Sequence, residues 1–271
     1  MIYDLQKASI IKRFSAFLLD AILIVILTTG VAFAISAIVD FGGKLERIEQ
    51  LDAECVREFE LGKYLPVPEN ADESYKHSMN ITKKVYDELS AEGKAAYDAA
   101  REAYKQKAGI DMIADYERLF FLFYLMISLG FFFAILIIEF IVPLFLKNGQ
   151  TPGKKIFGVG VMLINGVKVS PIALLVRSML GKYAIETMVP FSLVIFFLFI
   201  SPTLTILLVL IAIAILQLVL LIATKNNSLI HDILSSTVTV DMSTQMIFAT
   251  YDDLLAYKQE VAKRQSDERP Y

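Results

Sequence analysis

The sequence is poor in the residues that build disulfides and hydrolytic active sites. It contains a single cysteine, Cys55, and only two histidines, His77 and His231. One cysteine excludes a disulfide within the chain. No grouping of serine or cysteine with histidine and a carboxylate suggests nucleophilic catalysis. We therefore expect no enzymatic activity, no catalytic residues and no bound cofactor.

Charge is almost absent from three long stretches. Phe14 to Val39 contains one charged residue, Asp20, and Leu119 to Leu146 contains one, Glu139. Met188 to Thr224 contains none, and only Ser201-Pro202 interrupts it. The first two stretches exceed the roughly 30 Å of a bilayer core at about 1.5 Å per helical residue. The third is long enough for two spans with a turn after Ser201, the first of them beginning near Tyr183.

This pattern predicts an all-α membrane protein with about four transmembrane helices. The mean hydropathy of +0.56 agrees with it. The first stretch is too long for the apolar core of a cleaved signal peptide, so we expect it to be retained.

Basic residues predict the orientation. The 147–182 segment contains basic residues and no acidic ones, and Lys12-Arg13 precedes the first span. Basic residues close to span ends favour the cytoplasmic side. We therefore expect a multi-pass protein of the cytoplasmic membrane with both termini in the cytoplasm. His77 and His231 would then lie on opposite sides of the membrane, which excludes a shared metal site.

The expected domains follow from these boundaries. They are a leader and first span (1–39), an acidic helical extracytoplasmic insert (40–118), a second span (119–146), a basic cytoplasmic segment (147–182), the third and fourth spans (183–224) and a cytoplasmic tail (225–271). The insert has 18 acidic and 12 basic residues. It should contain helices over Leu45–Phe59, Ser74–Leu89 and Ala91–Ala108, with Ser90 capping the last.

The basic segment contains a glycine-rich stretch and a turn signal. Residues 149–155, GQTPGKK, resemble a phosphate loop, but the glycine spacing and the final lysine differ from that motif, which excludes nucleotide binding. Asn165-Gly166 lies between β-prone residues and predicts a small cytoplasmic β-hairpin. Ile172–Tyr183 should then form an amphipathic helix at the membrane interface.

Two acidic residues lie inside predicted spans. Asp20 follows Arg13 by about two helical turns, so the two side chains share one face and an ion pair between them is expected. Arg177 is an alternative partner for Asp20. Glu139 lies at a similar depth and could share a proton or a cation with Asp20. Acids inside the membrane are candidates for function, although they also serve assembly.

Three sequence elements resemble the RDD family of prokaryotic membrane proteins. They are KRFSAFLLD at residues 12–20, GQTPGKK at 149–155 followed by Gly158, and HDIL at 231–234 followed by Thr237-Val238. The resemblance covers residues 5–39 and 119–241, with the insert outside it. It implies Arg13, Asp20 and Asp232 as signature residues. For this family transport is the usual suggestion, with cation/proton exchange proposed for some members.

Two functions remain open. In the first, the chain is a transporter, with cation/proton exchange as one version, using Arg13, Asp20, Glu139 and Asp232. In the second, it is a non-transporting scaffold that binds a partner through its insert or tail. Four spans are few for a path across a bilayer, so we expect a homo-oligomer or a partner membrane protein. A small cation is the candidate substrate, and no nucleic-acid partner is expected.

The expected orientation makes a prediction about Cys55. A membrane-impermeant maleimide should label it in intact cells. Labelling of Cys55 only in inverted vesicles would show that the topology is the reverse of the expected one.

Overall fold

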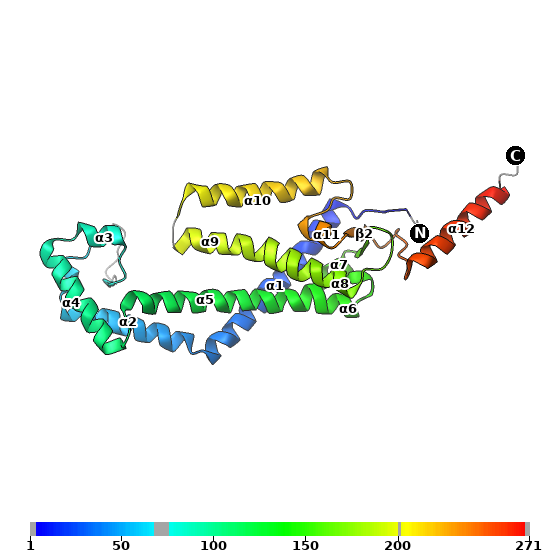
Figure 1. Ribbon diagram of the computed structural model, residues 1–271. Coiled ribbons are helices and arrows are strands. Elements are labelled where there is room, and N and C mark those ends of the chain that lie inside the picture. The colour runs from blue at the N-terminus through cyan, green and yellow to red at the C-terminus, as the bar shows by residue number, and fades with distance from the viewer. Residues whose placement is uncertain (1–3, 68–75, 200–201, 269–271) are drawn as a thin grey trace. The chain divides into compact units, whose positions relative to one another are not determined.

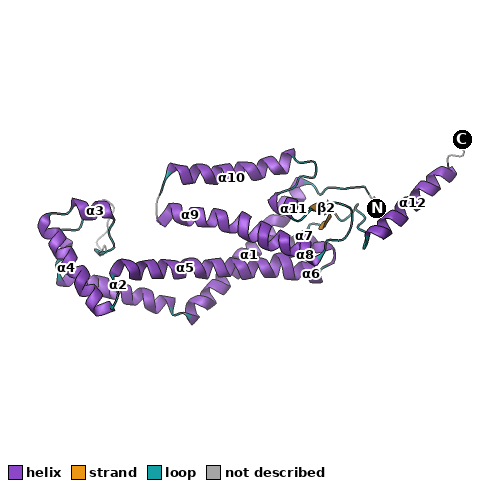
Figure 2. Ribbon diagram, in the orientation of Figure 1, coloured by secondary structure: helices purple, strands orange, loops and turns teal. Residues whose placement is uncertain are grey.

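The computed structural model describes residues 4–67, 76–199 and 202–268, and it is mostly helical (Figures 1 and 2). The chain divides into two compact units. The first unit is Met1–Val31 with Ser128–Tyr271, and the second is Ala32–Ile127. The second unit contains the whole of the predicted insert, 40–118.

Four helical stretches are long and apolar enough to cross a membrane, which confirms the predicted spans. They are Ile10–Ile38, Met112–Phe145, Pro171–Phe199 and Leu204–Ala223. The first is α1 (Ile10–Ile38), and the last is α10 (Leu204–Ala223). The second combines α5 (Met112–Ile135) with α6 (Val142–Phe145), and the third combines α8 (Pro171–Leu175) with α9 (Val189–Phe199). Ser201, where a turn was predicted, lies outside the described residues.

The two composite spans contain π-helical segments. The first runs over Leu136–Ile141, just before Pro143. Proline has no N–H for the usual helical bond to Glu139, and this loss accounts for the wider turn before it. The second runs over Val176–Met188. The helix predicted over Ile172–Tyr183 forms, but it continues directly into the third candidate span, because Pro171–Phe199 is one helical stretch. Its location at the membrane interface stays a prediction.

A two-stranded antiparallel sheet joins distant parts of the chain. Strand β1 (Val159–Leu163) pairs with β2 (Thr237–Asp241), with Val161 opposite Thr239. The Asn165-Gly166 turn forms, since Leu163 N–H donates to Val167 O over 2.9 Å. However, the residues after the turn form only isolated bridges, Lys168 with Met162 and Val167 with Phe248, so the second strand of the predicted hairpin does not form. The partner of β1 is thus β2, whose residues Val238 and Val240 pack with Met162 in a small buried cluster.

Short elements complete the first unit. A 3₁₀ turn covers Lys147–Gly149 and is followed by α7 (Pro152–Ile156). Helix α11 (Ile230–Leu234) precedes β2, and α12 (Tyr251–Glu268) follows it.

The second unit has a hydrophobic core of its own. Its elements are α2 (Phe41–Glu58), a 3₁₀ turn over Leu61–Lys63, α3 (Lys83–Glu88) and α4 (Ala91–Ala108). Ser90 Oγ accepts from Gly93 N–H, which confirms the predicted cap of α4. The helix predicted over Ser74–Leu89 is shorter, since the described residues are helical only from Lys83. Tyr97 and Tyr104 of α4 are buried against Cys55 of α2.

A buried carboxylate organises this core. Asp52 of α2 accepts hydrogen bonds from Met79 N–H over 2.8 Å and from the Tyr116 hydroxyl over 3.2 Å. Tyr104 donates to Asp115 over 2.9 Å. Because the buried Met79 N–H and the partly buried Tyr116 hydroxyl would lose this acceptor without Asp52, the residue helps to fix the path of the chain around α2.

The burial of Cys55 changes the test of orientation. Its exposed fraction is 0%, and burial raises the pKa of its thiol, so an unreactive Cys55 says nothing about topology. A Cys55→Ala protein with Gln106→Cys, at an exposed position of α4, should be labelled by an impermeant maleimide in intact cells. Ile164→Cys, at an exposed position in the predicted cytoplasmic segment, should be labelled only in inverted vesicles. The opposite pattern would contradict the predicted orientation.

Candidate functional site

Asp232, at the start of α11, holds together elements from both ends of the first unit. Its buried carboxylate accepts hydrogen bonds from the Arg177 guanidinium and from Arg13 Nη2, the latter over 3.2 Å. It also accepts from Leu229 N–H over 3.3 Å and so caps its own helix. Burial acts to raise the pKa of Asp232, but the charges of its neighbours outweigh burial and hold it below the usual range. One acid is therefore shared by two arginines.

Gly181 allows α11 to approach the third span closely. A Cβ at this position would lie 2.5 Å from His231 Cβ and 2.7 Å from His231 Cα. The His231 ring nitrogen Nδ1 lies 2.7 Å from the Glu186 carboxylate. Burial lowers the pKa of His231 below its ordinary value. The His231-Asp232 motif thus places both side chains against residues of the π-helical segment.

Glu139 is a second buried acid that is shared by two basic side chains. Its carboxylate contacts Lys154 Nζ at 3.3 Å and also pairs with Lys182. Lys154 belongs to α7, and Lys182 belongs to the third span. Burial lowers the pKa of Lys154 to about 8, against the opposing charge of Glu139. Glu139 is therefore compensated by two lysines.

Asp20 differs from the other two acids. Its side chain accepts from Thr151 Oγ1 over 2.5 Å and from Gly153 N–H over 2.8 Å. Thr151 caps α7, so Asp20 places its carboxylate at the start of that short helix. Among the ion pairs of the described residues, none involves Asp20. The carboxyl is nevertheless buried, with the residue 2% exposed.

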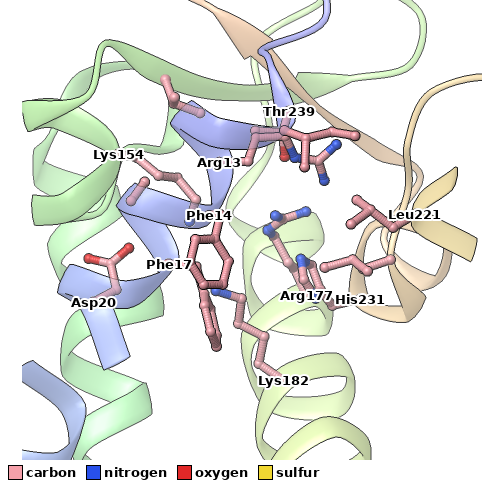
Figure 3. Close-up of a pocket in the computed structure, with 14 residues that line it drawn as sticks. Arg13, Phe14, Phe17, Asp20, Lys154, Arg177, Lys182, Leu221, His231 and Thr239 are labelled. Atoms are coloured by element: carbon pink, nitrogen blue, oxygen red, sulfur yellow. The ribbon is translucent and has the colours of Figure 1, made fainter. Parts of the chain in front are cut away.

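A pocket of about 300 Å³ lies beside these groups. Four cationic side chains line it: Arg13, Lys154, Arg177 and Lys182. In Figure 3, Arg13, Arg177 and His231 lie on one side of Phe14 and Phe17, and Asp20 and Lys154 lie on the other. The pocket thus has an arginine side and an aspartate side, both facing aromatic residues of α1.

The structure brings the four predicted site residues into one region but pairs them differently. The predicted ion pair between Arg13 and Asp20 is wrong, because Arg13 reaches Asp232 instead. Arg177, the alternative partner of Asp20, also binds Asp232. Glu139 is held by lysines rather than by a proton shared with Asp20.

Sequence reasoning missed the roles of Thr151, Lys154 and Lys182. The basic residues of 147–182 indicate orientation, but some of them also turn inward to neutralise acids. The signal for this was present: a segment with no acid lies near spans that contain acids without neighbouring bases.

The RDD family model matches residues 107–236. This match confirms the resemblance over the segment that contains Glu139, the GQTPGKK stretch and Asp232. Arg13 and Asp20 lie outside the matched residues, although the structure joins both of them to it. No match to a curated protein or to a solved structure was found.

Gly153 provides a first test of the site. A Cβ there would lie 2.3 Å from Ala16 O and 2.9 Å from Asp20 Cγ. Gly153→Ala should therefore separate α7 from α1 and destabilise the protein by about 1–3 kcal/mol. Gly30→Ala is the matched control, since nothing lies within 4 Å of the added atom. Equal thermal-unfolding midpoints for the two variants would contradict the close contact.

Asp232 provides a second test through a double-mutant cycle. Asp232→Asn leaves two buried guanidiniums without their acid and should cost about 3–5 kcal/mol. Arg13→Gln leaves Asp232 paired with Arg177 and should cost less, about 1–3 kcal/mol. The double variant should be less destabilised than the sum, as measured by thermal unfolding in detergent. Strict additivity would show that the two side chains do not interact.

Proposed function

We propose that this RDD-family membrane protein is a transporter in which Asp20 carries an exchangeable proton. The observation that carries the proposal is a carboxyl that is buried in an apolar span, lies beside a pocket and forms no ion pair with the described basic residues. Placing a charged aspartate in a membrane costs about 2.5–3.5 kcal/mol on insertion scales. A carboxyl that is in no ion pair loses less by taking up a proton than one that holds two cations.

The hydrogen bonds around Asp20 are compatible with both protonation states. The Thr151 hydroxyl can donate to the carboxylate or accept from the protonated acid. The Gly153 N–H can donate in either state. Glu139 and Asp232 differ, because protonation of either would leave two buried cations without their acid. Asp20 is therefore the acid through which exchange would run.

Cation/proton exchange is the version of transport that we test first. A small cation would replace the proton at Asp20, on the side of the pocket opposite the arginines (Figure 3). The nearby Thr151 hydroxyl and Ala16 carbonyl oxygens are the kinds of group that bind hard cations. Four spans are few for such a path, which supports transport by an oligomer.

A scaffold function has a specific observation in its favour. The ion pairs of Asp232 tie α1 to α11 and to the third span, and such ties stabilise a helical bundle whether or not a substrate moves. The second unit adds an independent core that could present a surface to a partner.

Flux measurements separate the two functions. Purified protein in proteoliposomes with an internal pH dye should move protons when a sodium or potassium gradient is imposed. Asp20→Asn keeps the size of the side chain but removes the titrating group, so it should lower this proton movement at least tenfold. Asp252→Asn, at an exposed position of α12, is the matched control and should retain full flux.

Two results would contradict the proposal. One is full proton movement by Asp20→Asn. The other is wild-type protein that moves no protons under either gradient, which would favour the scaffold function.

A further inference from the structure

The arginine side of the pocket has an excess of buried hydrogen-bond donors. Arg13 and Arg177 share the single carboxylate of Asp232. Arg177 also donates to Thr237 Oγ1 over 2.6 Å, yet its Nε–H has no partner among the described residues. The residue is only 3% exposed, so bulk water does not readily satisfy this group. A buried, unpaired donor on a charged group is costly and calls for an acceptor.

The geometry of the two arginines suits a tetrahedral anion. Both line the pocket, and Figure 3 shows their guanidinium groups facing one another. Arginine presents its donors in a planar fork that matches phosphate oxygens. A bound anion would accept from Arg177 Nε and would also reduce the repulsion between two cations that share one acid. We propose that this side of the pocket binds the phosphate group of an anionic ligand.

The apolar lining favours a phospholipid as the source of that phosphate. Phe14 and Phe17 line the pocket and are 62% and 59% exposed. Leu221, near the end of the fourth candidate span, lines it as well. Exposed aromatic side chains on a membrane span face acyl chains, so a lipid could place its headgroup at the arginines and its chains along α1. Basic pockets between membrane helices bind anionic headgroups in this way.

This inference goes beyond the proposed function and does not require transport. The acid that carries the exchangeable proton is Asp20, on the other side of Phe14 and Phe17 (Figure 3). A protein that moves no protons could therefore still bind phosphate. Failure of the transport proposal can thus be told apart from failure of the phosphate-binding proposal.

The test measures binding to the full chain purified in a neutral detergent. Native mass spectrometry compares retention of phosphatidylglycerol with that of phosphatidylcholine, and equilibrium dialysis measures binding of radiolabelled inorganic phosphate. Arg177→Lys keeps a positive charge beside Asp232 but removes the fork and the Nε donor. It should weaken phosphatidylglycerol binding at least tenfold, since a hydrogen bond to a charged group is lost.

Two further variants keep the test decisive. Lys155→Gln removes an exposed charge next to the pocket residue Lys154 and should bind like the wild type. If Arg177→Lys does not fold, Arg177→Gln replaces it, because Asp232 then keeps its ion pair with Arg13.

The outcomes divide as follows. Preference for phosphatidylglycerol that depends on Arg177 supports the proposal with a lipid as the source. Binding of inorganic phosphate with the same dependence, without preference between the lipids, supports the site with a soluble source. Binding by Arg177→Lys that equals binding by Lys155→Gln, whether reduced or not, or no binding of either phosphate source, would overturn it.

Discussion

The sharing of one buried acid between two basic side chains is the interaction on which the first unit depends. Asp232 is shared by Arg13 and Arg177, and Glu139 by Lys154 and Lys182. Burying a charge is expensive unless it is paired and hydrogen-bonded, so each acid constrains the position of two other elements. Asp232 thereby ties α1 and the third span to α11, and Glu139 ties α7 and the third span to the second. Among the described residues, Asp20 accepts hydrogen bonds from Thr151 and from the backbone of Gly153, and it forms no ion pair.

Much of the fold could be predicted from the sequence because it depends on local patterns. Long apolar stretches produce the four membrane helices, and a serine cap with a terminal glycine defines α4. The sequence predicts a third span that begins near Tyr183, whereas the helical stretch begins at Pro171 and includes Arg177 and Lys182. Asp232 and Glu139 form ion pairs with these two residues and compensate their charges. The composition of a segment does not reveal ion pairs with distant residues.

The sequence predicts which residues belong to the candidate site, but it does not predict which of them form ion pairs with one another. Arg13, Asp20, Glu139 and Asp232 all lie in one region, yet Arg13 and Asp20 share a helix face without forming an ion pair. The partner of Arg13 is 219 residues away in the chain. Helical periodicity shows which side chains share a face, whereas the choice among distant partners depends on close packing. Gly153 and Gly181 permit that packing, since a Cβ at either would collide with the facing element.

Solid-state NMR can measure the pairing of Arg13 directly. Protein in lipid, with ¹⁵N in the arginine guanidiniums and ¹³C in the aspartate carboxyls, reports their separation by rotational-echo double resonance. Asn replacement of each aspartate assigns its signal, and Arg177→Lys removes the second arginine from Asp232. The structure predicts strong dephasing of the Asp232 carboxyl by Arg13, whose Nη2 lies 3.2 Å from its oxygen, and little dephasing of Asp20. Strong dephasing of Asp20 with none at Asp232 would contradict this account and restore the local Arg13–Asp20 pair.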